Sequence, residues 1–443
     1  MSLGYIGNSL PAGWETPFLT DLVTPKQWRT ISTKDLIDDG YIVYGANGKI
    51  GFYSEYTHEY PTLMITCRGA TCGNLHISDS YSYINGNAMA LDGLPDHLVD
   101  IQFLYYALKA RGLVDTISGS AQPQITGQGL KKVRVPLPSF SEQKIIADKL
   151  DTLLAQVDNT KARLEQIPQI LKRFRQAVLA AAVSGKLTEE LWGTHVWRNF
   201  SIGQLAKNAK YSLGIGPFGS NLKVNDYKTE GHPLVFVRDI RSGIFGGVNT
   251  KYVNEDKFNE LKAHRVKPGD VLITKMGDPP GDVAIYPLNQ PEAIITSDCI
   301  KISLNESLVL TKFVLYTMMS EQFRAKVLSI SAGVAQQKVN LKNFKNIDID
   351  IPSLEEQTEI VRRVEQLFAY ADGIEKQVQN ALKRVNNLTQ SILAKAFRGE
   401  LTAQWRAENP DLISGENSAQ ALLAKIQQQR ANTKTAKRGS SKR

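Results

Sequence analysis

Glycine-rich loops with cationic or amide side chains are the parts of this sequence with the clearest chemistry. They occupy Tyr44–Lys49 and Thr66–Gly69 in the first half, and Gly216–Lys223 and Val237–Arg241 in the second. Asn, Arg and Lys are side chains that hydrogen-bond to purine edges in the major groove of DNA. The same glycines also suit plain surface turns, because glycine adopts backbone conformations that other residues avoid. These residues alone leave both interpretations open.

The turn Gly277-Asp278-Pro279-Pro280-Gly281 offers a second kind of chemistry. Amino-methyltransferases use an Asp-Pro-Pro-aromatic turn, in which polar oxygens accept the target amino group and the aromatic ring stacks on the flipped base. Gly281 replaces that aromatic residue, and the matching loop Gly69–Gly73 lacks the motif. We interpret the turn as structural. The alternative is a self-sufficient methyltransferase, which predicts that the isolated chain binds S-adenosylmethionine in equilibrium dialysis.

The sequence shows no pattern typical of a metal site or of a catalytic nucleophile. Cys67, Cys72 and Cys299 form no Cys-x-x-Cys pair, and His58 and His76 give no ligand spacing with the first two. We find no Walker A motif, nucleophile elbow, HExxH motif or acid pair suited to a nuclease metal site. A binding protein is therefore simpler than an enzyme.

An internal repeat must position these loops. Residues 137–188 and 351–402 are similar segments 214 positions apart, with Glu142-Gln143 matching Glu356-Gln357. Upstream the offset falls to 208 between Leu63–Thr66 and Val271–Thr274, and to 183 between Trp14 and Trp197. The second copy therefore has insertions of 25 and 6 residues in its first half.

Each repeated segment predicts one long helix. Apolar residues alternate at spacings of three and four over more than four heptads, which indicates a coiled coil. The first seam is Ile146, Leu150, Leu153, Val157, Leu164, Ile167, Leu171, Phe174 and Val178. The second is Ile360, Val364, Leu367, Ala371, Ile374, Val378, Ala381, Val385, Leu388 and Ile392. Because neither seam can remain in water, we expect the two helices to pack antiparallel.

The ends of both predicted helices are marked. A capping box, Ser139 to Glu142 and Ser353 to Glu356, opens each helix. Gly185 and Gly399 close them, since glycine tolerates the left-handed conformation found there. Pro168 should kink or locally unwind the first helix.

The chain therefore alternates a mixed α/β head with a long helix, an α+β architecture with a pseudo-two-fold repeat. The predicted boundaries are 1–136 for the first head, 137–188 for the first helix, 189–350 for the second head, 351–402 for the second helix and 403–443 for a basic, flexible tail.

Composition indicates a globular protein. The 443 residues carry a net charge of +9, and 42% are hydrophobic. No signal peptide and no apolar run of membrane-spanning length is evident, which predicts a cytoplasmic protein without a membrane partner. The charge is uneven, at −2 for residues 1–135 and +5 each for 191–350 and 406–443. Local patches rather than bulk charge must therefore carry any DNA contact.

Taken together, these segments resemble the specificity (S) subunits of type I restriction–modification enzymes. The type IA group is matched in the helices by Glu142–Ala147, Leu153–Asp158, Arg173–Leu179 and Ile392–Leu401. In the heads, Gly45–Gly48, Arg68–Ala70 and Asn85–Ala88 are similar to motifs of one subclass of target-recognition domain. Gly216–Ser220 and Ser297-Asp298 are similar to motifs of another.

The resemblance implies a non-catalytic reader of double-stranded DNA. Each head would bind one half of an asymmetric bipartite site, and the helices would fix the unread spacer. Two modification (M) subunits carrying S-adenosylmethionine would dock on the helices and methylate adenine N6. Restriction (R) subunits, with ATP and Mg, would add cleavage. No cofactor is expected in this chain. The seam of the first helix would be about 50 Å long, against 34–36 Å for one turn of DNA.

The residues expected to do this work fall into two sets. The predicted DNA-binding residues are Asn47, Lys49, Arg68, Gln122, Gln124, Ser220, Lys223, Arg238, Arg241, Lys275, Gln336 and Lys338. The predicted M-subunit interface is Leu154, Ile170, Leu179, Phe368 and Leu393, which lie beside the seams. The alternative for the second set is that it only widens the core between the helices. A third hypothesis for the whole chain, a coiled-coil scaffold with protein-binding heads, predicts no sequence-selective DNA binding.

Overall fold

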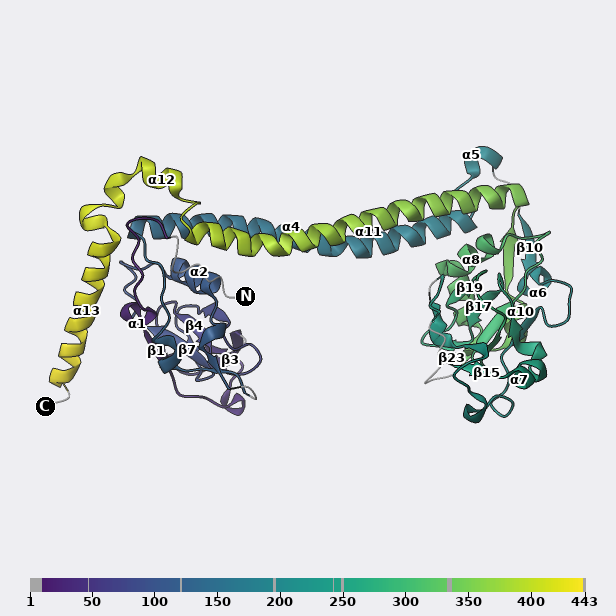
Figure 1. Cartoon of the computed structure of the whole chain (residues 1–443), viewed down its shortest axis with the longest axis horizontal. Coiled ribbons are helices and arrows are strands. Elements are labelled where there is room, and N and C mark those ends of the chain that lie inside the picture. Colours follow the sequence, from purple (N-terminus) through teal and green to yellow (C-terminus); the bar gives the residue numbers. More distant parts are fainter. Residues whose placement is uncertain are drawn as a thin grey trace. The chain divides into compact units, whose positions relative to one another are not determined.

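The structure, a computed structural model, describes residues 10–46, 48–119, 122–193, 197–241, 243–247, 251–332 and 337–440, with backbone only beyond residue 432. The chain forms two compact units. Unit 1 contains Met1–Glu165 and Asn380–Arg443, and unit 2 contains Gln166–Gln379. Each unit holds one head and part of both long helices, labelled α4 and α11 in Figure 1.

The two long helices are α4 (Phe140–Val183) and α11 (Leu354–Phe397). They run antiparallel, as predicted. In unit 1, Lys149 Nζ donates to Leu401 O, beyond the end of α11, over 2.7 Å. In unit 2, Arg175 is paired with Asp372 at 2.6 Å and Glu375 at 2.9 Å. Pro168 lies within α4, whose residues are helical on both sides of it, so no local unwinding is seen.

Burial follows the predicted seams with one exception. The buried seam residues are Ile146, Leu150, Val157, Leu171, Val178, Ile360, Val364, Ala371, Val378 and Val385. Fully burying an aliphatic side chain contributes about 1.5–3 kcal/mol, so the seam is a major source of stability. Leu388 is the exception, with 46% of its surface exposed.

The first head combines two small sheets with short helices. Its four-stranded sheet has the order β1 (Thr24–Gln27), β7 (Ala88–Asp92), β4 (Leu63–Thr66), β5 (Leu75–Ile77). Its three-stranded sheet has the order β3 (Gly48–Tyr53), β2 (Tyr41–Gly45), β6 (Tyr83–Ile84). Strands β8 (Ile117–Ser118) and β9 (Gln124–Ile125) form a pair. The helices are α1 (Leu19–Leu22), α2 (Ile101–Arg111) and α3 (Gly127–Leu130).

The second head repeats this plan with additions. Its sheets have the orders β11-β21-β17-β19, β15-β12-β20-β16 and β18-β23-β22, with the pairs β13-β14 and β10-β24. The bounds are β10 (Arg198–Ser201), β11 (Leu213–Ile215), β12 (His232–Val235), β13 (Ile240–Arg241), β14 (Ile244–Phe245), β15 (Tyr252–Val253), β16 (Arg265–Val266), β17 (Val271–Thr274), β18 (Met276–Gly277), β19 (Val283–Ile285), β20 (Ala293–Ile295), β21 (Cys299–Ile302), β22 (Ser331–Ala332), β23 (Gln337–Val339) and β24 (Asp348–Ile351). The helices are α5 (Glu189–Trp192), α6 (Ile202–Leu205), α7 (Glu255–Glu260), α8 (Thr311–Met319), α9 (Glu321–Ser329) and α10 (Leu341–Lys345).

The repeated Glu-Gln pairs join each head to a long helix. Gln143 Nε2 donates to Leu98 O (3.3 Å) and Pro138 O (3.2 Å), and its Oε1 accepts from Asp100 N (2.9 Å). Gln357 makes the same three contacts in the second head, with Leu308 O (3.1 Å), Pro352 O (3.0 Å) and Leu310 N (2.8 Å). Both amides are fully buried, so each fixes the start of its helix against its own head.

The capping boxes form only in part. Ser139 and Ser353 accept from the backbone N–H groups of Glu142 and Glu356, as predicted. The glutamate side chains turn elsewhere. The Glu142 carboxylate accepts from Trp14, Thr402 and Arg406, and the Glu356 carboxylate accepts from Thr188 over 2.9 Å.

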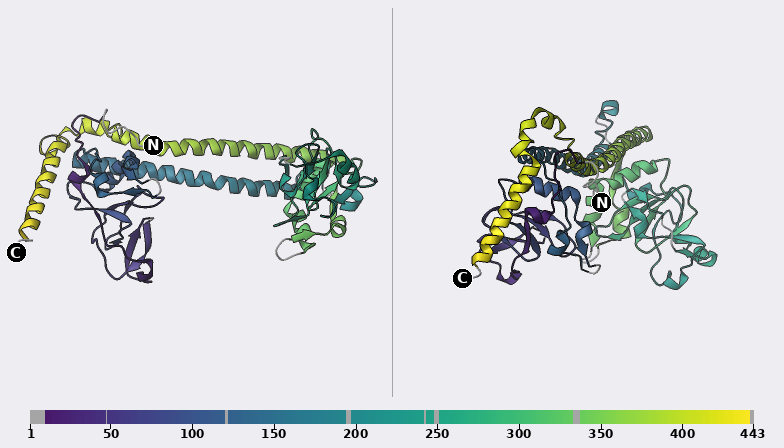
Figure 2. Two further views of the ribbon diagram at one scale, coloured as in Figure 1. Left: turned by 60° about the horizontal axis from the view of Figure 1, so that its bottom comes forward. Right: turned by 60° about the vertical axis from the view of Figure 1, so that its left-hand side comes forward.

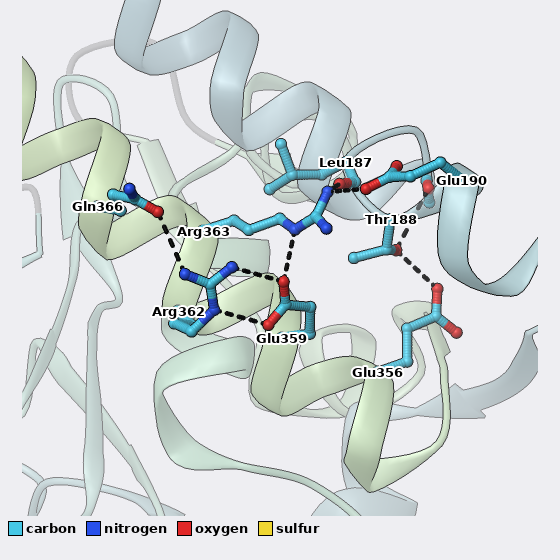
Figure 3. Close-up of polar contacts among 9 residues, drawn as sticks. Leu187, Thr188, Glu190, Glu356, Glu359, Arg362, Arg363 and Gln366 are labelled. Carbon is cyan, nitrogen blue, oxygen red and sulfur yellow. Dashed lines mark hydrogen bonds and ion pairs between the residues drawn. The ribbon is translucent and has the colours of Figure 1, made fainter.

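Figure 3 shows the contacts in unit 2 between the start of α11 and the residues that follow α4. There Arg363 donates to Leu187 O over 2.7 Å. Hydrogen bonds from Arg362 and Arg363 lower the pKa of Glu359, on the same helix, to about 2. The glycines that close both helices have positive φ, +75° at Gly185 and +72° at Gly399, as predicted.

The C-terminal segment differs from the prediction of a flexible tail. It forms α12 (Ala403–Glu408) and α13 (Ala419–Ser440), and α13 lies beside the first head (Figures 1 and 2). Leu422 and Ile426 are buried in the core of that head. Arg430 donates to three carbonyl oxygens, those of Thr20, Leu22 and Val23. Apolar residues at helical spacing therefore hold the segment, which basic composition alone did not reveal.

Candidate nucleic-acid interface

In the first head, the loop Asn85–Asn87 makes hydrogen bonds to residues at or next to the ends of three strands. Asn85 N donates to Tyr44 O (2.8 Å) near the end of β2, and Cys67 N, just after β4, donates to Asn87 O (3.1 Å). Gln27 Nε2, at the end of β1, donates to Gly86 O over 3.1 Å. The segments that follow these strands therefore lie at one edge of the head. They carry the predicted residues Lys49 and Arg68.

The second head builds the same edge around Thr296-Ser297-Asp298. Thr296 N donates to Val235 O (2.9 Å) at the end of β12, and Lys275 N, just after β17, donates to Asp298 O (2.7 Å). Gly216 N, just after β11, donates to Cys299 O over 3.2 Å. The first two contacts repeat backbone contacts of the first head, and the third joins the corresponding strand end through a different donor, so the two edges are built alike.

Each edge depends on one glycine, but on a different one. In the first head a Cβ on Gly86 would overlap the backbone carbonyl of Trp28 and Thr30 Oγ1. In the second head a Cβ on Gly216 would overlap the carbonyl of Thr296. Both heads therefore have a close approach between the segment after the edge strand and the central loop. The glycine that permits it lies in the loop in the first head (Gly86) and in the segment after the strand in the second (Gly216). This explains why the two heads carry different glycine motifs at equivalent places.

A short ladder adds a further segment to each edge. In the first head Arg68 pairs with Gln124, which also pairs with Ser118 across β8 and β9. In the second head Met276 pairs with Lys338, which pairs in turn with Ala332. The positions match through the repeat offsets of 208 and 214. The two ladders therefore present different side chains from equivalent backbones.

In the first head the structure brings the ladder residues together. Arg68, Gln122 and Gln124 are exposed. Thr66 Oγ1 donates to Ala46 O, which holds the hairpin tip beside the start of this loop. Lys49 is exposed but paired with Asp79 at 2.7 Å, and this hydrogen bond raises the pKa of Lys49 and lowers that of Asp79. Asn47 lies outside the described residues.

In the second head the predicted residues lie on several segments of the edge. Arg238 follows β12, and its guanidinium lies 4.5 Å from the centre of the Phe236 ring. Ser220, Lys223, Arg241 and Lys338 are exposed, and Lys275 is half-buried. Gln336 lies outside the described residues. Guanidinium, ammonium and amide groups at such an edge can bind phosphates and base edges.

Sequence reasoning missed Phe218 as a candidate. It lies in the loop after β11, between Pro217 and Gly219, and 73% of its surface is exposed. The signal was present, since an aromatic residue in a glycine-containing loop has no helix or strand face to bury it. The prediction named only the polar neighbours, because base readout was sought in hydrogen-bonding groups.

Three of the five residues predicted for the M-subunit interface are buried in the structure. Leu154, Leu179 and Leu393 are buried within their own units, at 7%, 1% and 0% exposure. They widen the cores formed by the helices and heads, so these side chains do not face a partner. Phe368 is half-buried against Tyr316, with ring centroids 5.8 Å apart. Ile170 is 57% exposed and stays a candidate.

Other sites weighed on the sequence have structural explanations. Gly281 N and Asp282 N both donate to Thr274 Oγ1 at 2.9 Å, so the Asp-Pro-Pro turn closes onto β17. Burial raises the pKa of Cys67, and that of Cys299 to about 12, which disfavours reactive thiolates. Within the described ranges no three His, Cys, Asp or Glu residues are placed to hold a metal ion. Within those ranges, too, no helix is long and apolar enough to cross a membrane.

Comparison with known proteins identifies the chain. The family model described as "Type I restriction modification DNA specificity domain" matches residues 11–169 and 224–384. The EcoBI specificity subunit of Escherichia coli is 44% identical over 350 residues, covering 74% of this chain and 72% of that protein. The EcoKI specificity subunit of Escherichia coli strain K12 is 42% identical, covering 76% and 73%.

Solved structures agree on the fold. A chain from a type I restriction–modification system, solved for its complex assembly and conformational transition, has a TM-score of 0.61 at 16% identity and covers 89% of this chain and 100% of that one. The HsdS subunit from Thermoanaerobacter tengcongensis has a TM-score of 0.57 at 17% identity, covering 89% and 99%. The chain belongs to the specificity subunits of type I restriction–modification enzymes, and it is the non-catalytic DNA specificity subunit of such a system.

Proposed function

We propose that each head reads one half of an asymmetric bipartite site in double-stranded DNA through its edge loops. The observation that carries this proposal is the pair of equivalent edges with different side chains. Arg68 and Gln124 in the first head stand where Met276 and Lys338 stand in the second. Identical edges would read identical sequences, whereas these present different hydrogen-bonding groups to the bases.

The catalytic steps belong to partners. Two modification subunits, one for each half-site, would bring S-adenosylmethionine and methylate adenine N6. Restriction subunits, with ATP and Mg, would add cleavage to the complex. Support comes from the family and from the duplicated head-and-helix plan, which offers two similar docking positions. Because the substrate is DNA, we place the complex in the cytoplasm.

Sequencing the methylated bases of DNA from cells carrying the complete system tests this proposal. We expect one motif with two specific parts separated by a fixed gap. A chain that assembles with its modification subunits but directs methylation to no bipartite motif would contradict the proposal.

Replacing Arg68 with Ala should relax one half of the motif only. A bidentate contact to a base edge is worth about 1–3 kcal/mol of discrimination. Lys338→Ala, at the other head's ladder, serves as the reciprocal control and should affect the opposite half. The readout is methylation of a randomised DNA library. A uniform loss across all sequences would instead assign Arg68 to a phosphate.

The candidate docking surface for a modification subunit is tested at Ile170. Because apolar interface residues lose binding energy when a charge is introduced, Ile170→Lys should weaken assembly about ten-fold or more. Gln169→Lys adds the same charge at the neighbouring exposed position and should have little effect. Mass photometry of the mixed subunits reports the stoichiometry, and circular dichroism checks the fold. Equal assembly of both variants would place the interface elsewhere.

A further inference from the structure

Phe218 is an exposed aromatic side chain on an anchored turn. The turn is closed by a hydrogen bond from Asn221 N to Phe218 O (2.8 Å). On one side Gly216 lies against the Thr296 backbone, and on the other Leu222 is buried in the head. Lys257 Nζ adds a contact to Asn221 O at 3.4 Å. The ring is therefore presented to solvent by a backbone that is fixed at both ends.

The turn belongs to the edge that carries the candidate DNA contacts. The loop Thr296–Asp298 lies against Gly216 after β11, and it makes hydrogen bonds with the end of β12 and with the residue after β17. Phe218 thus lies on one of the segments gathered there, together with those that hold Arg238 and Lys275. Exposed Ser220 and Lys223 follow it in the same loop. An exposed apolar ring in a loop that also carries a hydroxyl group and an ammonium group is poorly suited to solvent, but it suits a base stack bounded by phosphates.

At the position that corresponds to Phe218, the first head has no aromatic ring. Gln27 pairs with Met89 in β7, and Ile215 pairs with Ile300 in β21, so the two strand ends correspond. Three residues beyond each end stand Thr30 and Phe218. At this position only the second head carries an aromatic residue, as a device for one half-site would.

We propose that Phe218 is a wedge that enters the half-site read by the second head and partly unstacks one base step. Proteins that deform DNA insert apolar side chains in this way. Pyrimidine–purine steps unstack most easily, so such a wedge would favour a flexible step without hydrogen-bonding to it. This inference rests on the proposed function and adds to it a readout by deformability in one head.

The test uses the full chain assembled with its modification subunits and DNA containing the methylated motif. 2-Aminopurine replaces one base at a time across both halves, because its fluorescence rises when stacking is lost. With the native chain we expect a rise at one step of one half-site. A rise at the methylated adenine itself is expected in every variant, since methyltransferases extrude their target base.

Three variants separate the wedge from other roles. Phe218→Ala should abolish the rise at that step and weaken binding about 10- to 100-fold, the usual value of an aromatic–base stack. Phe218→Leu keeps an apolar wedge and should retain most of both effects. Leu288→Ala is the matched control, since Leu288 is 82% exposed and lies beyond β19, at the opposite edge of the same sheet.

The outcomes are distinct. A Phe218→Ala complex with native affinity and the native fluorescence pattern overturns the wedge. Weaker binding with an unchanged pattern also overturns it and leaves a simple apolar contact to the bases. If Phe218→Ala did not assemble, Phe218→Ser and Phe218→Leu would provide the same comparison. A native complex that methylates no bipartite motif contradicts the proposed function instead, before any variant is made.

Discussion

Replacing Glu142 with Ala is expected to lower the free energy of unfolding by about 3–5 kcal/mol, the usual cost of breaking a buried ion pair. Its carboxylate is 1% exposed and accepts from Arg406 (2.6 Å), Thr402 (2.6 Å) and Trp14 (3.0 Å). The substitution would leave the Arg406 guanidinium, itself only 18% exposed, without its carboxylate. Urea denaturation followed by circular dichroism measures the loss.

The repeat supplies a matched control for this prediction. Glu356 stands at the equivalent position and is also buried, but its carboxylate accepts from Thr188 and has no arginine partner among the described residues. Glu356→Ala should therefore cost less, about 1.5–3 kcal/mol, as expected for a hydrogen bond to a charged group. Adding Arg406→Met to Glu142→Ala should recover part of the loss, because no unpaired cation stays buried. Equal costs at Glu142 and Glu356 would show that the ion pair contributes nothing.

Lengthening both long helices by one heptad is expected to change the spacing of the DNA site. Seven residues inserted after Ala162 and seven after Lys376 preserve the seam phase, because a heptad restores the same helix face. Each helix then lengthens by about 10 Å, or roughly three base pairs of B-DNA. Methylation should move to sites with the longer gap. At the original spacing one head would then lie over the wrong base pairs. Methylation there should be lost almost completely, since each mismatched base pair costs about 1–3 kcal/mol.

Methylome sequencing of cells carrying the lengthened chain reads out the new gap. A useful control inserts seven residues into the first helix only. The two helices then differ in length by about 10 Å, so their seams no longer match along the whole length and assembly should fail. An active complex with both insertions that still methylates the original spacing would show that the helices do not set the gap.

The sequence by itself determined the features whose causes are local or periodic. The repeat at an offset of 214 residues, the apolar seams and the closing glycines at 185 and 399 predicted two long antiparallel helices that alternate along the chain with mixed α/β heads. These predictions are confirmed, because helical period, first-turn caps and the freedom of glycine act over a few residues. The sequence also singled out glycine-rich loops with cationic side chains, and their contact with DNA stays a prediction.

Only the tertiary structure decided which neighbours these residues meet. Leu154, Leu179 and Leu393 proved to be buried, because the heads cover sides of the helices that a two-helix seam would leave open. The Glu142 side chain does not complete the predicted capping box. It accepts a hydrogen bond from Arg406, which lies 264 residues away in the sequence. The C-terminal segment became a helix on the first head, and Phe218 joined an edge built by segments far apart in the chain. Burial and charge pairing depend on such long-range contacts, which helical period and local propensity do not encode.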